Sequence, residues 1–183
     1  MSRKTSQSVP RLRVRSAEPA DAEALAEIFQ ESWKSAYLGI IPHLHLEAMV
    51  RRRNVTWWRR ALDGSRRTLI LEVAGTPAGY ANWGKARIRG PYQGEIYELY
   101  VAPIYQGLGF GEYLFEAARH AMDEAQLRGL IVWAITQNEG ACAFYRRRGG
   151  RPITRASERF GSVKLEKTAF GWPDVVPARK GSS

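Results

Sequence analysis

The stretch Val101-Ala-Pro-Ile-Tyr-Gln-Gly-Leu-Gly-Phe-Gly-Glu112 lies where a strand-like segment gives way to an amphipathic helical segment. Its three glycines, at positions 107, 109 and 111, lack a Cβ atom, so the backbone can adopt positive φ angles and approach a ligand closely. The first N–H groups of a helix have no intrahelical partners and carry the positive end of its dipole, which favours a phosphate group. The stretch therefore predicts a phosphate-binding turn, although the same glycines would also suit a tight turn without a ligand.

Hydrophobic periodicity and turn residues predict the elements on both sides of this stretch. Helices are expected at about 20–36, 43–62, 109–127 and from 138 to Gly149. Strands are expected at 12–15, 68–73, 78–83, 95–101 and 130–135, with a final hairpin of 152–154 and 162–167. The continuous apolar run 130–135 is typical of a strand that is buried on both faces.

The glycine spacing differs from two familiar phosphate loops. A P-loop ends in Gly-Lys-Ser/Thr, whereas Gly111 is followed by Glu112 and Tyr113. A dinucleotide fingerprint has the spacing G-x-G-x-x-G early in a βαβ unit, whereas this chain has G-x-G-x-G in the middle of its sequence. The stretch resembles instead motif A of the GNAT acetyltransferases, Gln/Arg-x-x-Gly-x-Gly/Ala, with Gln106, Gly109 and Gly111 in its three defined positions.

A second stretch resembles the same family. Asn138-Glu-Gly-Ala-Cys-Ala-Phe-Tyr145, followed by Gly149, is similar to motif B, with Asn, Ala, Phe-Tyr and Gly at the family's spacing. The expected order of elements, β–α–α–β–β–β–α–β–α–β–β over residues 11–168, also matches, so the chain is identified as a member of the GNAT superfamily. The resemblance implies an α/β (α+β) GNAT fold, with a mixed, mostly antiparallel sheet of about six or seven strands and helices on both faces.

Composition is that of a soluble globular chain. With 183 residues, 44% of them hydrophobic and 25% charged, we expect one domain over 11–170, with tails at 1–10 and 171–183. The single cysteine, Cys142, excludes an internal disulfide and suits a reducing compartment. No apolar run reaches the roughly 20 residues that span a bilayer, and the basic N-terminal segment lacks the apolar stretch of a signal peptide. We therefore expect a cytoplasmic protein with no membrane partner.

The net charge of +10 favours anionic partners. The arginines are clustered at 51–53, 59–60, 66–67 and 146–148. We interpret the clusters as solvated helix faces together with an anionic cofactor, and nucleic-acid binding is the main alternative.

Acetyl transfer to an alkyl amine requires that the amine lose its proton. Its pKa lies about 3 units above neutrality, so deprotonation at pH 7 costs about 4–5 kcal/mol, and a carboxylate is the usual base. Glu98 is the predicted general base: strand alternation places it on the face of Ile96 and Tyr100, and places Glu95 on the other face. The alternative is a surface carboxylate, or one that pairs with an arginine.

The resemblance implies further roles. Tyr145 matches the family tyrosine that protonates the departing thiolate, and Asn138 matches the residue that binds the pantetheine arm. A strand amide near Tyr100 would be the oxyanion donor, at a bulge in the central strands. The residues predicted to bind acetyl-CoA, the expected co-substrate, are Leu99, Tyr100, Val101, Gln106, Gly107, Leu108, Gly109, Phe110, Gly111, Asn138, Ala141 and Phe144.

The first helices and the final hairpin are expected to form the acceptor pocket, with Trp33, Tyr37, Tyr80 and Trp83 as candidate lining residues; core packing is the alternative for each. The segment 33–42 resembles the first-helix region of bacterial family members thought to act on small molecules. We therefore expect direct acetyl transfer, in a ternary complex, to a primary amine of a small molecule. The alternatives are acetylation of a protein N-terminus or lysine, or of an aminoacyl-tRNA, and a CoA- or nucleic-acid-binding module without catalysis.

The remaining candidate groups predict no further chemistry. His43 and His45 lie two residues apart, on different faces of a helix and without the partners that zinc requires, so no metal is expected. Cys142 lacks a His–Asn pattern that would activate it, which favours a buried thiol. A homodimer is an open alternative because many members of the family dimerise.

Overall fold

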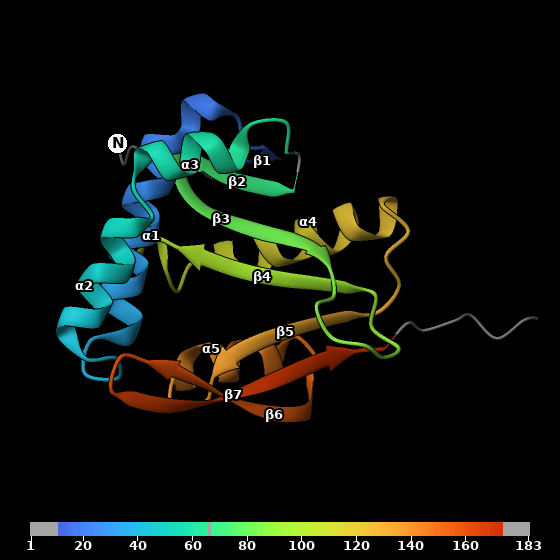
Figure 1. Cartoon of the computed structure of the whole chain (residues 1–183). Helices are drawn as coiled ribbons and strands as arrows, with labels where there is room; N and C mark the ends of the chain where they lie inside the picture. The colour runs from blue at the N-terminus through green and yellow to red at the C-terminus, as the bar shows by residue number, and fades with distance from the viewer. Residues whose placement is uncertain (1–10, 66, 174–183) are drawn as a thin grey trace, which may run out of the picture.

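One mixed sheet, in the order β1-β2-β3-β4-β5-β7-β6, carries the part of the chain that this computed structural model describes, residues 11–65 and 67–173 (Figure 1). The strands are β1 (Leu12–Ser16), β2 (Thr68–Val73), β3 (Thr76–Lys85), β4 (Gly94–Val101), β5 (Leu130–Ile135), β6 (Arg151–Phe160) and β7 (Val163–Trp172). Among these described strands, β4 and β5 form the one parallel pair. The expected mixed, mostly antiparallel sheet is confirmed.

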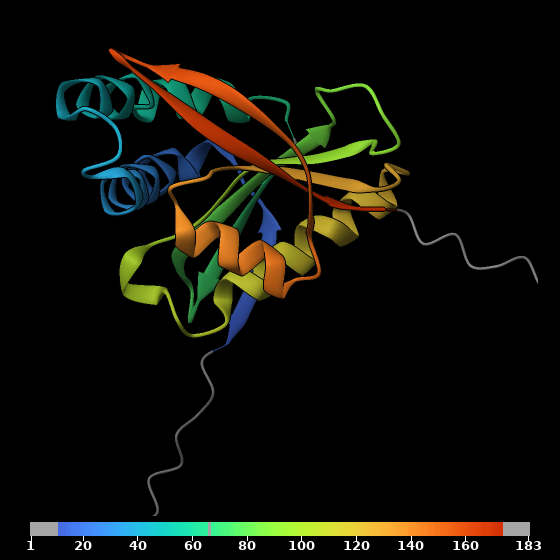
Figure 2. The ribbon, with the colours of Figure 1, turned by 90° about the horizontal axis from the view of Figure 1, so that it is seen from below.

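The helices cover both faces of the sheet (Figure 2). They are α1 (Ala22–Tyr37), α2 (His43–Arg52), α3 (Val55–Leu62), α4 (Phe110–Glu124) and α5 (Glu139–Arg147), with short 3-10 turns η1 (Pro19–Asp21) and η2 (Pro103–Tyr105). Leu25, Phe29 and Trp58 of α1 and α3 form one core with β2 and β3. Leu114 and Phe115 of α4 form a second core on the opposite face. None of the helices in the described ranges is long and apolar enough to cross a membrane.

Two elements differ most from those expected. The single helix expected over 43–62 is two helices, because Asn54 Oδ1 accepts a hydrogen bond from Trp57 N (3.0 Å) and begins α3 as its N-cap. Arg53 therefore lies at the join between α2 and α3. The final hairpin is longer than expected: Gly171 and Trp172, assigned to the C-terminal tail, are the last residues of β7. The expected tails at 1–10 and 174–183 lie outside the described residues.

A β-bulge in β4 changes which residues share a face. Asn82 pairs with Glu98 and Trp83 pairs with Ile96, so Tyr97 is an extra residue between the two pairs. The expected placement of Ile96 beside Glu98 is therefore wrong, because Ile96 packs in the α4 core, whereas the ring of Tyr100 packs against the core of α1 and α3. Because of this extra residue Glu95 lies on the same face as Glu98, whereas strict alternation placed the two on opposite faces.

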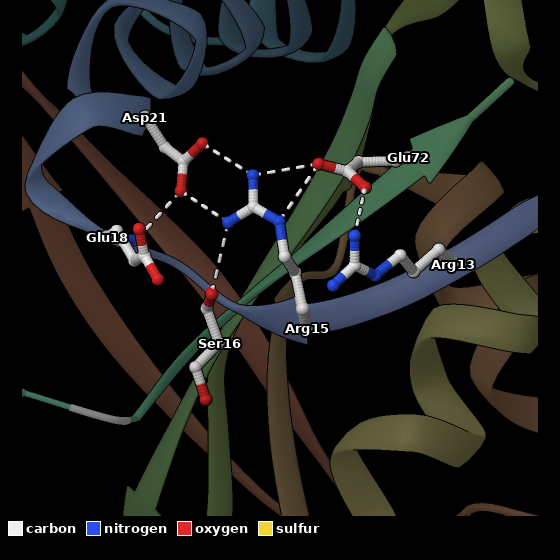
Figure 3. Close-up of polar contacts among 6 residues, drawn as sticks. All are labelled: Arg13, Arg15, Ser16, Glu18, Asp21 and Glu72. Atoms are coloured by element: carbon white, nitrogen blue, oxygen red, sulfur yellow. Dashed lines mark hydrogen bonds and ion pairs between the residues drawn. The ribbon is translucent and has the colours of Figure 1, made fainter. Parts of the chain in front are cut away.

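Hydrogen bonds and ion pairs within a cluster of charged residues connect β1 to the start of α1 (Figure 3). Arg15 donates to both carboxylate oxygens of Asp21 (2.7 and 2.8 Å) and, through Nε, to Glu72 of β2 (2.9 Å). Asp21 also accepts from the backbone N–H of Glu18 (2.7 Å), in a capping box. Asp21, an acidic residue of the helix start predicted at 18–21, therefore also bonds to a side chain of β1.

Replacement of Asp21 by Asn is expected to lower the free energy of unfolding by about 1–2 kcal/mol at pH 7, because Arg15 loses one of its two charged partners. Hydrogen bonds from Arg15 hold the pKa of Asp21 below its usual value of 3.8. A carboxyl group whose pKa is lower in the folded than in the unfolded protein stabilises the fold at pH values above its unfolded-state pKa. This stabilisation is lost as the pH falls through its folded-state pKa. The difference between wild type and D21N should thus be constant above about pH 5 and shrink below about pH 4.

Urea unfolding at a series of pH values measures this difference. Replacement of Glu23, an exposed acidic residue in the first turn of α1, by Gln is the matched control, with little effect expected. If D21N lowered the free energy of unfolding by the same amount at every pH, the loss could not be assigned to the Arg15–Asp21 ion pair.

Candidate active site

A cavity of about 640 Å³ opens where β4 and β5 separate. The two strands pair only from Gly94↔Leu130 to Ile96↔Val132, although β4 continues to Val101 and β5 to Ile135. Residues 97–101 line one side of the cavity and residues 132–134 line the other, while α1, the glycine loop and α5 close it. The separation brings groups from both faces of the sheet to one space.

The glycine loop forms one end of the cavity, at the start of α4. Gly107 (φ 78°) and Gly109 (φ 82°) have positive φ angles, and Gly109 is the N-cap of α4, so glycine is required at both. Gln106 donates from Nε2 to Val101 O (2.9 Å) and so ties the loop to the end of β4. At Gly111 a Cβ atom would lie 3.4 Å from the Phe144 ring, which is an ordinary contact.

All but two of the residues predicted to bind acetyl-CoA line this cavity. The exceptions are Leu108, whose side chain is 63% exposed, and Phe110, whose side chain is buried in the α4 core. Glu112 and Arg148 also line the cavity and form an ion pair with each other, and neither was predicted individually. Arg148 belongs to the arginine cluster 146–148, which was the available signal.

Motif B contributes α5 and five of the lining residues, Asn138, Gly140, Ala141, Phe144 and Tyr145. Asn138 is the N-cap of this helix, with Oδ1 accepting from Ala141 N (3.1 Å). Tyr145 is buried among aromatic rings that include Phe170 and Trp172, and burial raises the pKa of its hydroxyl. The hydroxyl is therefore protonated at neutral pH, as a proton donor has to be.

The four candidate acceptor-pocket aromatics occupy different places. Tyr37 lines the cavity, with its hydroxyl 3.4 Å from that of Tyr100, and burial raises the pKa of both hydroxyls. Trp33 packs between Phe29 and Tyr37. Tyr80 is fully buried, and the expectation for Trp83 is wrong: Trp83 lies in the α4 core, because residues three apart in a strand point to opposite faces.

Glu98 lines the cavity on the face of α1 and α3, and four hydrogen bonds hold its carboxylate. Arg53 Nη2 donates to Oε1 (2.8 Å) and to Oε2 (2.6 Å), while Tyr80 (3.1 Å) and Asn82 (2.8 Å) donate to Oε2. The pairing with an arginine that sequence analysis left open is therefore observed, in a carboxylate that also lines the cavity. Arg53 and Asn82 were not predicted as partners of Glu98, because neither residue belongs to a motif.

Comparison with known proteins now decides the family. Residues 22–150 match the family model described as Acetyltransferase (GNAT) family. The chain belongs to this family. As a member it is an acyltransferase, and acetyl-CoA is the co-substrate of the family.

Individual relatives agree with this assignment. The chain is 26% identical, over 88% of its length and 93% of the relative's, to the uncharacterized N-acetyltransferase YuaI of Bacillus subtilis. Its fold matches the PaiA N-acetyltransferase of Thermoplasma acidophilum, solved with coenzyme A (TM-score 0.70, 21% identity, 86% of this chain and 98% of the other). It also matches YncA, a putative acetyltransferase of Salmonella typhimurium solved with acetyl-CoA (TM-score 0.65, 22% identity, 94% and 99%).

The other candidate groups of this acetyltransferase have structural partners. Glu95 is fully buried and its carboxylate accepts from the Arg87 side chain (2.6 and 3.1 Å) and the Arg87 N–H (2.8 Å). Cys142 is buried, and its thiol lies 3.8 Å from the carbonyl oxygen of Ile135. Within residues 11–65 and 67–173 no group of three or more His, Cys, Asp or Glu residues is placed to hold a metal ion.

Proposed function

We propose that this acetyltransferase moves the acetyl group of acetyl-CoA directly to a primary amine of a small molecule, in a ternary complex. One observation carries the proposal: a single cavity is lined by the glycine loop, by Tyr145 and by Glu98. The candidate phosphate-binding turn, the candidate proton donor and a carboxylate therefore face the same space from three different elements.

Acetyl-CoA would lie along the opening between β4 and β5. Its pyrophosphate would accept hydrogen bonds from the first N–H groups of α4, at the positive end of the helix dipole. Beyond Ile96 none of the described residues pairs with β4 on its β5 side, so the pantetheine arm can lie against the backbone of 99–101. The complexes of the PaiA and YncA proteins with coenzyme A and acetyl-CoA support this assignment of the cofactor.

Glu98 would take a proton from the acceptor ammonium, directly or through one water, because only the neutral amine can attack. The amine nitrogen then bonds to the thioester carbonyl carbon, and a backbone N–H near Tyr100 stabilises the negative charge on the oxygen. As the intermediate collapses, the C–S bond breaks and Tyr145 gives its proton to the thiolate. The attacking nitrogen loses its second proton, which returns through water to the Tyr145 phenolate, and Glu98 releases the first proton to solvent. The products are the N-acetylated amine and free coenzyme A.

The recessed position of the reactive groups favours a slender acceptor. The Glu98 side chain is 15% exposed and Tyr37 is 7% exposed, so an amine on a narrow chain reaches them more readily than one on a folded surface. A second candidate is an amine on an acidic macromolecule. Four exposed arginines on α2 and α3, Arg51, Arg52, Arg59 and Arg60, favour such a partner.

Addition of acetyl-CoA is expected to stabilise the protein against unfolding by about 2.7 kcal/mol at a hundredfold excess over its dissociation constant, because the ligand binds only the native state. Thermal unfolding with and without acetyl-CoA measures this. The control ligand is S-acetylpantetheine, which keeps the thioester and lacks the pyrophosphate. No shift at saturating acetyl-CoA would contradict the assignment of the cavity.

A panel of acceptors, scored by release of free thiol, then identifies the amine. It contains polyamines, amino acids, aryl-alkyl amines, peptides with free N-termini or lysines, and an aminoacyl-tRNA. Turnover of a small amine supports the proposed function. Turnover confined to the peptides or to the aminoacyl-tRNA supports the second candidate, and no turnover with any of them contradicts both.

A further inference from the structure

We propose that Arg53 is a positioning residue for the reaction, which fixes the orientation of the Glu98 carboxylate and directs one oxygen, Oε1, to the acceptor. This inference rests on the proposed function, in which Glu98 removes the amine proton. Arg53 lies at the join between α2 and α3, 45 residues before Glu98 in the sequence. Arg53 lies outside both GNAT motifs.

Aromatic rings fix the guanidinium of Arg53. Its central carbon lies 3.9 Å from the ring centre of Trp57, 4.7 Å from that of Phe29 and 4.9 Å from that of Trp58. A planar guanidinium stacks on aromatic faces, and the attraction is stronger where water is excluded. Arg53 Nε is buried and has no hydrogen-bond partner within the described part of the chain, so this edge of the guanidinium is shielded from water. The surrounding rings leave the group little freedom to turn.

The hydrogen bonds to Glu98 are unequally divided between its two oxygens. Oε2 accepts from Arg53, Tyr80 and Asn82, whereas Arg53 is the one donor to Oε1 among the residues that the structure describes. Each carboxylate oxygen has two lone pairs, so Oε2 is saturated and Oε1 keeps one lone pair. Oε1 is therefore the atom that can accept the proton of the amine or of an ordered water.

A third strand orients this arrangement. Thr68 of β2 donates from Oγ1 to Asn82 Oδ1 (2.7 Å), which leaves the Asn82 amide nitrogen directed at Glu98. Thr68 is buried, at 7% exposure. The hydrogen bonds that hold Glu98 thus involve residues of β2, β3 and the α2–α3 join. Together they restrict rotation of the carboxylate.

The competing explanation is an ion pair that only stabilises the fold. A partly buried ion pair is weak evidence for stability by itself, because desolvation offsets much of the attraction. The two explanations differ in kinetics: a positioning role lowers the rate of the chemical step in correctly folded enzyme, and a structural role lowers only the amount of folded enzyme.

The test compares four variants with the best small amine from the panel, measuring kcat, KM for each substrate and the thermal midpoint. R53Q is expected to lower kcat at pH 7 by about 10- to 100-fold with KM for acetyl-CoA unchanged, and R53K to recover part of this loss. T68V keeps every charge and is expected to lower kcat several-fold. R13Q removes an exposed arginine of β1 that does not line the cavity and should match wild type.

A pH series separates base positioning from a general defect. An alkyl amine with a pKa like that of lysine, about 10.4, becomes roughly tenfold more abundant in its neutral form with each pH unit between 7 and 9. The deficit of R53Q should therefore shrink as the pH rises, because solvent then deprotonates the amine. A structural defect has no reason to follow the pKa of the acceptor.

Wild-type kcat in R53Q and T68V, or a deficit that is equal at pH 7 and pH 9, would overturn the positioning role. If R53Q fails to fold, R53K and T68V, which keep the positive charge, still give both readouts. Failure of wild type to acetylate any amine is a different result, because it contradicts the proposed function itself.

Discussion

Replacement of Glu98 by Gln is expected to lower kcat for an alkyl amine by about 10²- to 10⁴-fold, because the amide cannot accept a proton at neutral pH. KM for acetyl-CoA should be unchanged, since Glu98 lies on the α1 side of the opening and the glycine loop lies at the start of α4. Arg53 loses its charged partner, so the free energy of unfolding should also fall, by about 1–3 kcal/mol. Steady-state kinetics per mole of folded enzyme separates the two effects.

The same substitution at Glu95 is the matched control. Glu95 lies three residues away in the same strand and is fully buried, but it pairs with Arg87. E95Q is expected to lower stability and to keep the kcat of the enzyme that remains folded. Turnover by E98Q at the wild-type rate would assign proton removal to solvent or to another group, and would remove the basis for the role of Arg53 as well.

Replacement of Tyr145 by Phe is expected to lower kcat by about 10²-fold, at the lower end of the range for acid–base catalysis because a thiolate is already a good leaving group. Acetyl-CoA affinity should change little, since Phe keeps the ring that packs against Phe115, Phe170 and Trp172. Burial raises the pKa of Tyr145 above its usual value of 10.0. A raised pKa keeps the acid protonated, so loss of Tyr145's proton should cause no fall in rate below pH 10.

Tyr113 provides the control for this substitution, because it lies on the first turns of α4 with 46% of its surface exposed. Y113F is expected to match wild type in kcat and in thermal midpoint. Undiminished turnover by Y145F, with normal binding of acetyl-CoA, would show that the thiolate leaves without this acid.

Local features were predictable because neighbouring residues determine them. Positive φ angles at Gly107 and Gly109, the start of α4 beside them and the cap of α5 by Asn138 depend on the chemistry of short segments. Two such segments were enough to predict the family and the sheet. Two predictions at the element level were wrong: the structure has two helices where one was expected over 43–62, and the last hairpin is longer than expected. The strands and the remaining helices follow the expected order.

The detailed environment of the candidate base was beyond the sequence. The extra residue at Tyr97 arises from the pairing of β3 with β4, and no local pattern marks it, so alternation placed Ile96 and Glu95 on the wrong faces. Trp83 was a plain error of strand geometry, since it lies three residues from Tyr80.

The sequence alone therefore determined the glycine loop, the order of the strands and the membership of the family, because each depends on residues close together in the chain. Only the tertiary structure decided which groups meet at the cavity. Arg53 and Asn82 reach Glu98 across 45 and 16 residues, and a contact between side chains that distant depends on strand register and helix packing. The separation of β4 from β5 after Ile96, which makes the cavity, is likewise a property of two strands together.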